Sequence, residues 1–500
     1  MTEQITDPAD LSAAEARRLI ARKALSSEEL ARACIARVET LDHAVNALVA
    51  RDFDGLIEGA RGADAMLARG EALGLLHGLP FGVKDMIDVK GLPTTFGSEL
   101  FRDNIAKGDD PIVTAMRQAG ALPIGKTNNP EWSAGGNTRN RVYGATANPY
   151  DLTRSCAGSS GGSAVALACG YAPLATGSDT GGSLRNPAAF CGVVGYRPSP
   201  GIVPGSSRPM GYIPMSTSGP MARTVEDTAL MLSVMARTDM RDPYNAVIDG
   251  ANLWDPAGFA QLPRADLSSL RVAWTEDFGF APTEGIVRDH FAGVVKALAP
   301  AFGSFEAETP DCADADRVFA VLRAVLFMGM HGKRVDETPE LVGPNVIDNV
   351  AEGRRYSAED VADALMKQGN YYHRWQSWFQ DWDVILSPAV TISPRDWHEL
   401  YPTEIDGTPT QSYYHWLAMA YASTIAGHPS ITIPCGFDAN GMPFGLQITG
   451  RRYADRQVLA IAAELEAVIA GIPGLAPRAP DFAALAAAKP LREVEGFLSL

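Results

Sequence analysis

The sequence predicts an α/β fold in one large domain, and three observations lead to this prediction. Short apolar segments such as 79–83 and 171–178 alternate with segments of helical periodicity such as 113–118 and 225–235, which is typical of a sheet covered by helices. Strand-like segments return near the C-terminus. No linker rich in Pro, Gly or Ser and no block of like charge divides the 500 residues. We therefore expect one domain, 1–500, although length alone would allow roughly two to four.

The first 75 residues predict a helical layer. Ser26-Ser27-Glu28-Glu29 is typical of a helix N-terminus and precedes the periodic run LARACIARVETL (30–41). Further along the chain, LRVAWT (270–275) predicts a strand and the segment 286–298 predicts a helix. These two segments continue the alternation of strands and helices.

Residues 311–420 stand out by their aromatic content, and we expect an aromatic-rich helical insertion there. Five tyrosines between positions 371 and 414 accompany five of the eight tryptophans of the chain. Two interpretations stay open: the aromatic side chains pack between helices, or they line a pocket. The five tryptophans are Trp375, Trp378, Trp382, Trp397 and Trp416.

Strand character returns in three segments toward the C-terminus. They are DVILSPAV (383–390), PSITIPCGF (429–437) and GLQITG (445–450). An alanine-rich segment at 456–469 predicts a long helix after them. We expect these segments to complete the same sheet, since nothing separates them from the rest of the chain.

Charge and hydropathy exclude several classes of partner. The chain has 43 Lys and Arg against 59 Asp and Glu, a net charge of −16. Such a balance provides no basic face for nucleic acid or an anionic membrane surface. No segment reaches the ~18 apolar residues that a membrane crossing needs. We expect no nucleic-acid or membrane partner, and a homodimer is left open.

The spacing of the cysteines and histidines indicates the cellular compartment and argues against a metal cofactor. The six cysteines contain no CxxC and are widely spread, which is typical of buried thiols in a reducing cytoplasm. The first ten residues, MTEQITDPAD, lack the basic start and apolar run of a signal peptide. The eight histidines form no HExxH and never pair with cysteine at metal spacing. We therefore expect a cytoplasmic protein without a metal or another cofactor.

A block rich in glycine and serine carries the strongest functional signal. Residues 158–211 hold 12 of the 48 glycines, and between 156 and 196 only Asp179 and Arg185 are charged. Such a segment is mostly buried. A flexible linker does not fit, because AVALACGYAPLA (164–175) interrupts the block with residues typical of a core.

Two short motifs match by composition, but their contexts argue against them. Residues 120–127 (GALPIGKT) fit the phosphate-binding pattern GxxxxGK[ST], yet a helical segment precedes them and Asn128-Asn129-Pro130 is a poor start for the required helix. We expect a helix, a cap at Gly120 and then a strand. Residues 158–162 fit the GxSxG elbow with Ser160 as nucleophile, but the segment NPYDLTRSCA before them is not an apolar strand.

Several motifs in order give the chain a resemblance to the amidase signature family. The matching segments are HGLPFGVKDMIDVKGLPTTFGS (77–98), GKTNNPEW (125–132), the block 157–201 and GPMARTVEDTALML (219–232), with weaker pieces at 383–390 and 427–450. The resemblance implies a mixed, twisted β-sheet core covered by helices on both faces, with the catalytic motifs in residues 76–240. The departures are mild: Tyr196-Arg197-Pro198 replaces a frequent Leu-Lys-Pro, and 426–429 varies a turn that commonly contains Asn.

The resemblance also implies roles for individual residues. Ser183 is the nucleophile, Ser159 passes protons after a cis peptide bond from Gly158, and Lys84 is the base. A buried lysine suits this role, because burial disfavours its charged form and leaves it able to accept a proton near neutral pH. The backbone N–H groups of the nucleophile loop would form the oxyanion hole. These donors belong to Thr180, Gly181, Gly182 and Ser183.

Asp179 and Arg185 are best interpreted as structural supports of the nucleophile loop. Each needs a partner, because an isolated buried charge is very costly. Singly, Lys84, Ser159 and Ser183 would fit a surface ion pair, a helix cap and a turn. Their order and their glycine-rich surroundings favour catalysis instead.

The resemblance implies a hydrolase of amide bonds that works through an acyl-enzyme. Aromatic walls around Ser183 would favour bulky or aryl amides, anilides, carbamates or esters over a small polar amide such as glutamine. The partner is then a small-molecule amide. Three alternatives remain: a component of the glutamine-hydrolysing amidotransferase type, an ATP-binding enzyme using 120–127, and a binding protein that retains the fold without catalysis.

Overall fold

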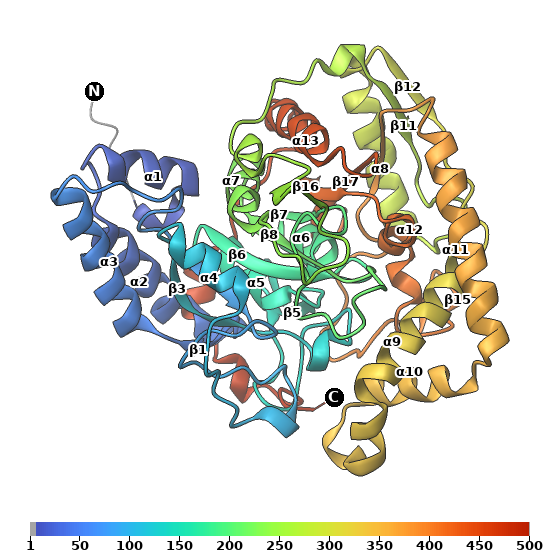
Figure 1. Ribbon diagram of the computed structural model, residues 1–500, viewed down its shortest axis with the longest axis horizontal. Helices are drawn as coiled ribbons and strands as arrows, with labels where there is room; N and C mark the ends of the chain where they lie inside the picture. Colours follow the sequence, from blue (N-terminus) through green and yellow to red (C-terminus); the bar gives the residue numbers. More distant parts are fainter. Residues whose placement is uncertain (1–6, 500) are drawn as a thin grey trace.

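The computed structural model describes residues 7–499 as one α/β domain around an eleven-stranded mixed sheet (Figure 1). The strand order is β1-β3-β2-β6-β8-β7-β16-β17-β13-β11-β12. The strands are β1 (Leu48–Arg51), β2 (Pro80–Lys84), β3 (Leu122–Thr127), β6 (Leu174–Asp179), β7 (Val194–Arg197), β8 (Thr217–Ala222), β11 (Arg271–Trp274), β12 (Ser304–Ala307), β13 (Val384–Pro388), β16 (Ser430–Phe437) and β17 (Pro443–Gly450).

The sheet is parallel near its two ends and antiparallel in its middle. β3, β2 and β6 run parallel, as do β13, β11 and β12. The strands from β6 to β13 pair antiparallel. β16 and β17 are buried almost throughout, which explains their continuous apolar runs. The predicted mixed sheet is confirmed, and C-terminal strands lie at its centre.

Helices cover both faces of the sheet. α5 packs on β6 and α6 on β16 and β17, while α7 and α13 pack on each other and on the sheet. The helices are α1 (Ala13–Ala21), α2 (Ser27–Val45), α3 (Phe53–Ala68), α4 (Pro111–Gln118), α5 (Gly161–Ala168), α6 (Arg185–Cys191), α7 (Val225–Met235), α8 (Gly285–Leu298), α9 (Ala315–Glu337), α10 (Pro344–Arg355), α11 (Ala358–Trp378), α12 (Ala418–Ala426), α13 (Asp455–Ala470) and α14 (Phe482–Ala487).

The N-terminal segment is helical, with one exception. α2 begins at the predicted cap: Ser26 accepts from the backbone N–H of Glu29, and the Glu29 carboxylate accepts from the N–H of Ser26. The exception is β1, which the sequence did not predict. It joins the sheet as an edge strand antiparallel to β3. Four residues carry too short a pattern to be recognised, and the pairing depends on a distant strand.

The predicted insertion at 311–420 is wrong in its extent. α9, α10 and α11 form a helical layer on the side of the molecule opposite α1, α2 and α3 (Figure 1). β13 then returns to the sheet between β17 and β11. Residues 384–388 therefore belong to the core, and the helical part ends at Trp378.

The tryptophans of this region pack in different places. Trp375 is fully buried and lies against Phe278, Phe379 and His428. Trp378 and Trp382 stack on each other, Trp397 belongs to a separate small core, and Trp416 packs on Phe190. For Trp375 the packing interpretation is confirmed.

Within residues 7–499, no helix has both the length and the apolar character to cross a bilayer. In the same residues, no group of three or more His, Cys, Asp and Glu side chains is arranged to hold a metal ion. All six cysteines are buried and free.

Candidate active site

Lys84, the last residue of β2, lies at the centre of a cluster of hydroxyl groups. β2 is flanked by β3 and β6, and all of its residues are buried. The Lys84 Nζ atom lies 2.7 Å from Ser159 Oγ and within 3.1 Å of Ser160 and Ser178 Oγ. The amine therefore has three uncharged hydroxyl partners.

This environment changes the protonation of Lys84. Burial lowers the pKa of its amine from 10.5 to about 7, although the nearby negative charge of Asp179 acts to raise it. A large share of the amine is thus neutral near pH 7 and can accept a proton. The side chain is no surface ion pair with Asp85, because Asp85 instead pairs with the buried Lys126.

Ser159 follows a cis peptide bond, Gly158–Ser159, as the resemblance implies. A methyl group at position 158 would lie only 3.1 Å from the Gly135 carbonyl oxygen and from Thr138 Oγ1. The close approach explains why glycine is required there. Thr138 also donates a hydrogen bond to the Ala157 carbonyl, which fixes the chain just before the cis bond.

Ser183 lies in the turn between β6 and α6 and is partly exposed. Its backbone carbonyl accepts a hydrogen bond of 3.2 Å from the N–H of Ser160, which holds the turn against the loop of Ser159. Within residues 7–499, no hydrogen bond joins the Ser183 hydroxyl to Ser159 or Lys84. The structure therefore brings the two loops together and joins Ser159 to Lys84, but leaves the Ser183 hydroxyl free.

The turn before Ser183 is shaped for backbone donors. Gly182 has φ +105°, a conformation that favours glycine. Its N–H donates to Asp179 Oδ1 at 2.9 Å, so one of the four predicted oxyanion donors is already used inside the protein. The N–H groups of Thr180, Gly181 and Ser183 have no acceptor among the described residues.

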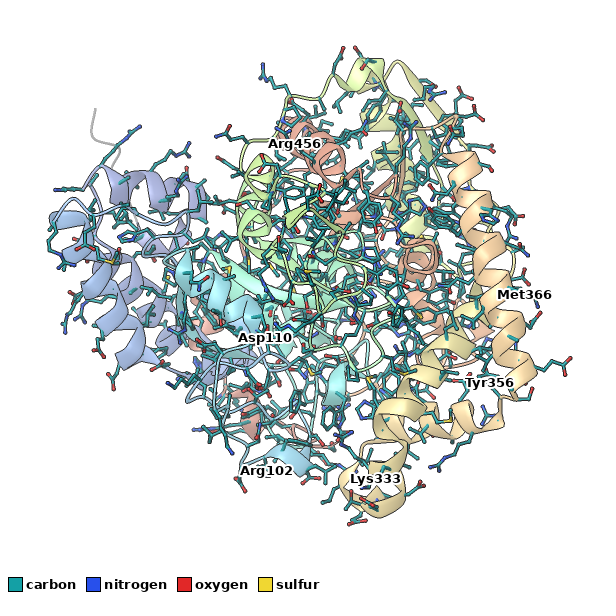
Figure 2. The ribbon with its side chains drawn as sticks, in the orientation of Figure 1. Arg102, Asp110, Lys333, Tyr356, Met366 and Arg456 are labelled. Carbon is teal, nitrogen blue, oxygen red and sulfur yellow. The ribbon has the colours of Figure 1, made fainter. Side chains whose placement is uncertain are left out.

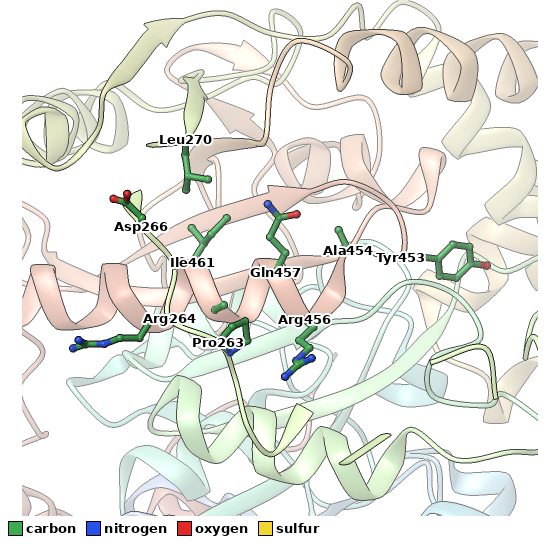
Figure 3. Close-up of a pocket in the computed structure, with 11 residues that line it drawn as sticks. Pro263, Arg264, Asp266, Leu270, Tyr453, Ala454, Arg456, Gln457 and Ile461 are labelled. Carbon is green, nitrogen blue, oxygen red and sulfur yellow. The ribbon is translucent and has the colours of Figure 1, made fainter. Parts of the chain in front are cut away.

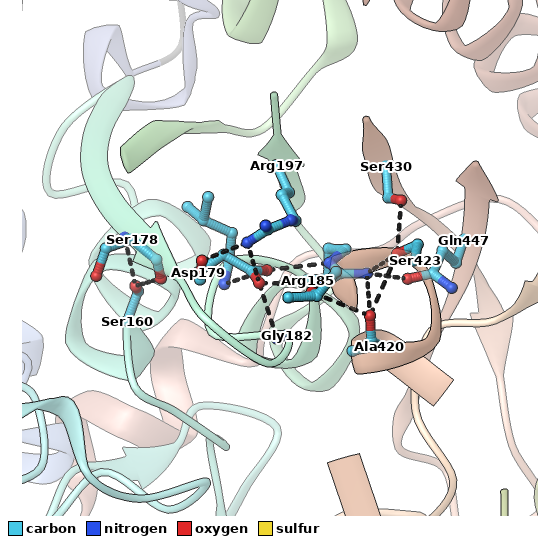
Figure 4. A network of polar contacts seen from close by, with 12 residues as sticks. Ser160, Ser178, Asp179, Gly182, Arg185, Arg197, Ala420, Ser423, Ser430 and Gln447 are labelled. Atoms are coloured by element: carbon cyan, nitrogen blue, oxygen red, sulfur yellow. Dashed lines mark hydrogen bonds and ion pairs between the residues drawn. The ribbon is translucent and has the colours of Figure 1, made fainter. Parts of the chain in front are cut away.

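Asp179 and Arg185 form the centre of a buried ionic network (Figure 4). Arg185 donates through Nε and Nη2 to the two carboxylate oxygens, each at 3.0 Å. A second arginine, Arg197, approaches the same carboxylate at 3.2 Å. Burial alone would raise the pKa of Asp179, but the two guanidinium groups outweigh this effect and hold the pKa well below its usual range.

Arg185 also joins the turn to the C-terminal part of the sheet. Its Nη1 donates to the Ala420 carbonyl, Ser423 Oγ and Gln447 Oε1 at 2.8–2.9 Å. The turn that carries Ser183 is thereby fixed to α12 and β17. This geometry is what a supporting role for Arg185 requires.

Sequence reasoning missed three residues of the site. Ser160 and Ser178 both accept from Lys84, and Arg197 is the second cation on Asp179. The signal for Arg197 was present, since a buried aspartate next to a catalytic turn needs cationic partners and Arg197 was one of few charges nearby. No sequence pattern points to the serine contacts, which depend on how β2, β6 and the Ser159 loop meet.

The structure also shows the surroundings of the two short motifs at 120–127 and 158–162. Residues 122–127 form β3, and Lys126 Nζ is buried 3.1 Å from Asp85 Oδ1, so this lysine is not free to hold a phosphate. Upstream of Ser160, β5 (Asp151–Ser155) is a strand after all, but it lies outside the main sheet, where it pairs with β4 (Ala147–Asn148) and, through a single bridge, with Asp396. The elbow therefore lacks its buried central strand.

An aromatic cluster lies against the nucleophile turn. A methyl group on Gly181 would lie 2.8 Å from the Phe319 ring, which shows how closely α9 approaches the turn. Phe319 stacks on Tyr421 at 4.2 Å and meets Tyr414 edge-on at 5.6 Å. Both tyrosines line a cavity of about 560 Å³. A cavity of similar size between α13 and the segment 263–270 (Figure 3) contains none of these residues.

Comparisons with known proteins agree with this geometry. The family model for Amidase matches residues 29–459. The acylamidase of Rhodococcus erythropolis is 35% identical over 468 residues, covering 92% of this chain and 95% of the relative. One component of the glutamyl-tRNA(Gln) amidotransferase of Alkaliphilus metalliredigens is 34% identical, with 89% and 94% covered. A solved bacterial aryl acylamidase of the amidase signature family superposes with a TM-score of 0.84 at 27% identity, covering 96% and 99%.

The mixed sheet and the buried lysine and serine cluster beside a cis peptide bond accompany these matches, which define the class of protein: a hydrolase that acts on amide carbon–nitrogen bonds. Matches over nearly the whole chain make the assignment specific. The protein belongs to the amidase signature family. Its fold and its amide-hydrolysing activity are those that the sequence motifs predicted.

Proposed function

We propose that Ser183 is the nucleophile, Ser159 the proton relay and Lys84 the base of an acyl-enzyme mechanism. The observation that carries the proposal is the 2.7 Å contact between a buried Lys84 Nζ and Ser159 Oγ, with the turn of Ser183 held against the same loop. Ser183 gives its proton to Ser159 as Ser159 gives its own to neutral Lys84. Catalytic contacts often tighten only when substrate binds, so a free Ser183 hydroxyl suits the resting enzyme.

The bond changes then follow in two halves. Ser183 Oγ attacks the amide carbonyl carbon and forms a tetrahedral oxyanion. The proton on Lys84 returns through Ser159 to the leaving nitrogen, and the C–N bond breaks. Water repeats the sequence on the acyl-enzyme: it loses a proton through Ser159, attacks the ester carbon and releases the carboxylic acid with regeneration of Ser183.

The unpaired N–H groups of the turn are the proposed oxyanion donors. Thr180, Gly181 and Ser183 offer theirs, while the Asp179 carboxylate fixes the Gly182 N–H and so the shape of the turn. Fixed donors stabilise charge that develops in the transition state without reorganisation. Asp179 and Arg185 act here as positioning residues.

We propose a bulky or aryl amide as substrate. The cluster of Phe319, Tyr414 and Tyr421 beside Gly181 provides an aromatic surface for such a group. The names of two relatives, an acylamidase and an aryl acylamidase, point the same way. Anilides, carbamates and esters of similar shape remain within the proposal.

A second candidate is glutamine-amide hydrolysis in an amidotransferase, favoured by the 34% identity to a component of a glutamyl-tRNA(Gln) amidotransferase. The chemistry would be the same, and only the substrate would differ. Ammonia release from glutamine, compared with kcat/KM for acetanilide, separates the two. A higher kcat/KM for glutamine would overturn the aryl proposal.

Two sequence predictions about context stay predictions. The six buried free thiols fit the reducing cytoplasm that the sequence predicts. A homodimer, left open by the sequence, is decided by light scattering on the purified chain. Neither prediction affects the proposed chemistry.

The test of the mechanism is a set of single substitutions. We expect Ser183→Ala and Lys84→Met to lower kcat/KM for acetanilide by at least about 10³-fold, as loss of a nucleophile or base does, with circular dichroism unchanged. Ser206→Ala, a serine of the same glycine-rich block outside the cluster, serves as control and keeps its activity. Full activity of the Ser183→Ala protein would contradict the assignment of Ser183 as the nucleophile.

A further inference from the structure

Arg323 on α9 is a buried charge that the proposed mechanism leaves unused. Its side chain is only 5% exposed. Among the described residues it has no ion-pair partner and no hydrogen-bond acceptor, and Nε is fully enclosed without a partner. The two Nη atoms are not enclosed in this way, so they still border open space. An unpaired buried charge is costly. Arg323 is therefore a candidate for binding an anionic ligand.

Aromatic rings surround the Arg323 guanidinium. Its Cζ lies 4.5 Å from the Phe327 ring centroid, 5.1 Å from Tyr413, 5.6 Å from Tyr414 and 5.9 Å from Phe319. Rings of this kind hold a cation without using its N–H groups. Burial lowers the pKa of Arg323 to about 10, so the group remains charged at neutral pH and keeps its donors free.

The nearest acidic group does not neutralise Arg323. Glu352 is close enough to influence its charge, but lies beyond ion-pair distance. The Glu352 carboxylate accepts hydrogen bonds from the hydroxyls of Tyr356 at 2.8 Å and Tyr414 at 3.0 Å. Beside Arg323, the hydroxyl of Tyr413 is also buried and has no partner among the described residues. Two buried groups with unused donors thus lie together.

The position of Arg323 on α9 relates it to the proposed catalytic turn. Residues four apart lie on one face of a helix, and this face carries Phe319, Arg323, Phe327 and His331. Phe319 lies against Gly181 of the nucleophile turn. His331, at the other end of the face, packs on Trp132 at 4.9 Å. Arg323 lies between the two contacts.

The second contact also leads back to the catalytic residues. Trp132 belongs to the loop that reaches Gly135, whose carbonyl oxygen lies against Gly158 at the cis peptide bond. α9 therefore spans from the nucleophile turn to the loop that supports Ser159.

We propose that Arg323 binds an anionic group of the substrate, and that the group is a carboxylate. The guanidinium fork matches a carboxylate with two parallel hydrogen bonds, which a lysine or a ring cannot reproduce. The inference rests on the proposed function, because it places the anion relative to Ser183. It narrows the substrate class to amides whose acyl or amine part carries a carboxylate.

Three acidic residues, Asp316, Asp348 and Glu352, line the cavity that Tyr413 and Tyr414 border, and two of them are engaged by tyrosine hydroxyls. Asp316 accepts from the hydroxyl of Tyr421, as Glu352 does from two tyrosines, so these carboxylates are engaged by the protein. Arg317 and Arg355 line the same cavity. Arg323 lies against the rings of Tyr413 and Tyr414, which line this cavity, and it is the buried cation beside them that has no ion-pair partner among the described residues.

The test compares carboxylate and methyl forms of the same amide. One pair, N-phenylsuccinamate and butyranilide, varies the acyl part, and the other, 4-acetamidobenzoate and 4-methylacetanilide, varies the amine part. We expect the wild-type enzyme to have a higher kcat/KM for the carboxylate than for the methyl member of one pair, and we compare variants by the ratio of these two kcat/KM values. In Arg323→Gln this ratio should fall about 10- to 100-fold, the effect expected of a lost hydrogen-bonded charge pair, and in Arg323→Lys by less.

A matched control removes the same charge from the surface of the same helix. Lys333 lies at the periphery of the molecule (Figure 2), with its side chain 83% exposed. Lys333→Gln should leave both ratios as in wild type. This comparison separates direct binding of the carboxylate from a change in the overall electrostatic field of the protein.

The outcomes are distinct. No preference for a carboxylate in wild type, or unchanged ratios in a folded Arg323→Gln protein, overturns the inference and leaves the mechanism standing. A lower melting temperature with equal losses on both members of each pair assigns Arg323 to packing and also overturns it. Activity of Ser183→Ala on all four substrates would instead overturn the proposed function.

Discussion

Lys84 is suited to act as a base because it is buried and its hydrogen-bond partners are uncharged hydroxyl groups. Three serine hydroxyls surround its amine, and burial brings its pKa to about 7. Burial disfavours the charged form of the amine, so that a large share of Lys84 is neutral near pH 7. The ability of Lys84 to accept a proton thus depends on its burial as much as on its contacts with the three serines.

The protonation of Lys84 predicts a pH dependence. Below pH 7 the amine is charged and cannot accept the proton of Ser159, whereas above pH 7 it is neutral. We therefore expect kcat/KM for acetanilide to fall about tenfold per unit below pH 7 and to level off above it. Initial rates between pH 5 and 9 measure this. A flat profile over that range would contradict the role of Lys84.

Single residues also show how far sequence reasoning reaches. Lys84, Ser159, Ser183, Asp179 and Arg185 were predicted by number because each lies inside a recognisable motif, and the structure places them close together, with Ser183 partly exposed and the others buried. Contacts between motifs were not predictable. The free Ser183 hydroxyl, and the Gly182 N–H used by Asp179, depend on backbone geometry that no spacing rule encodes.

At the scale of elements, local signals predicted most helices and strands. α7 begins and ends where its periodicity does, at 225 and 235, and α2 begins after its predicted cap. Elements defined by distant partners were harder. β1 has four residues and exists by pairing with β3, and the place of β13 between β17 and β11 became visible only in the sheet.

One helix end predicts a pH dependence of stability. The Glu466 carboxylate of α13 accepts the N–H of Val225 at the start of α7, at 3.1 Å. Burial, together with the negative charges of Asp227 and Glu226, raises its pKa to about 7. In the unfolded chain a glutamate has a pKa of about 4.3. The folded state thus binds more protons between these values, and this group lowers stability as pH rises through the window.

Glu466→Gln removes this titration while keeping a side chain that can accept the Val225 N–H. We expect the variant to gain free energy of unfolding relative to wild type at pH 8, and to gain less at pH 5. Urea unfolding at the two pH values measures the difference. An equal difference at both values would contradict the assigned protonation.

At the scale of the whole molecule, the site is assembled from distant parts of one sheet. β2 supplies Lys84, β6 leads to the turn that carries Ser183, and β17 and α12 hold Arg185. Figure 1 shows α9, the helix that carries Arg323, on the side opposite the N-terminal helices. The sequence predicted one domain, but not the strand order, since pairing between strands far apart in sequence leaves no local pattern.

The central claim is that Ser183 forms the acyl-enzyme, and trapping that intermediate tests it most directly. A slowly released aryl ester or amide, quenched in acid and followed by peptide mass spectrometry, locates the acyl group. We predict one acyl group on the peptide bearing Ser183 in wild type and none in Ser183→Ala. An acyl group on Ser160 or Ser159, or undiminished acylation of the Ser183→Ala protein, would contradict the account.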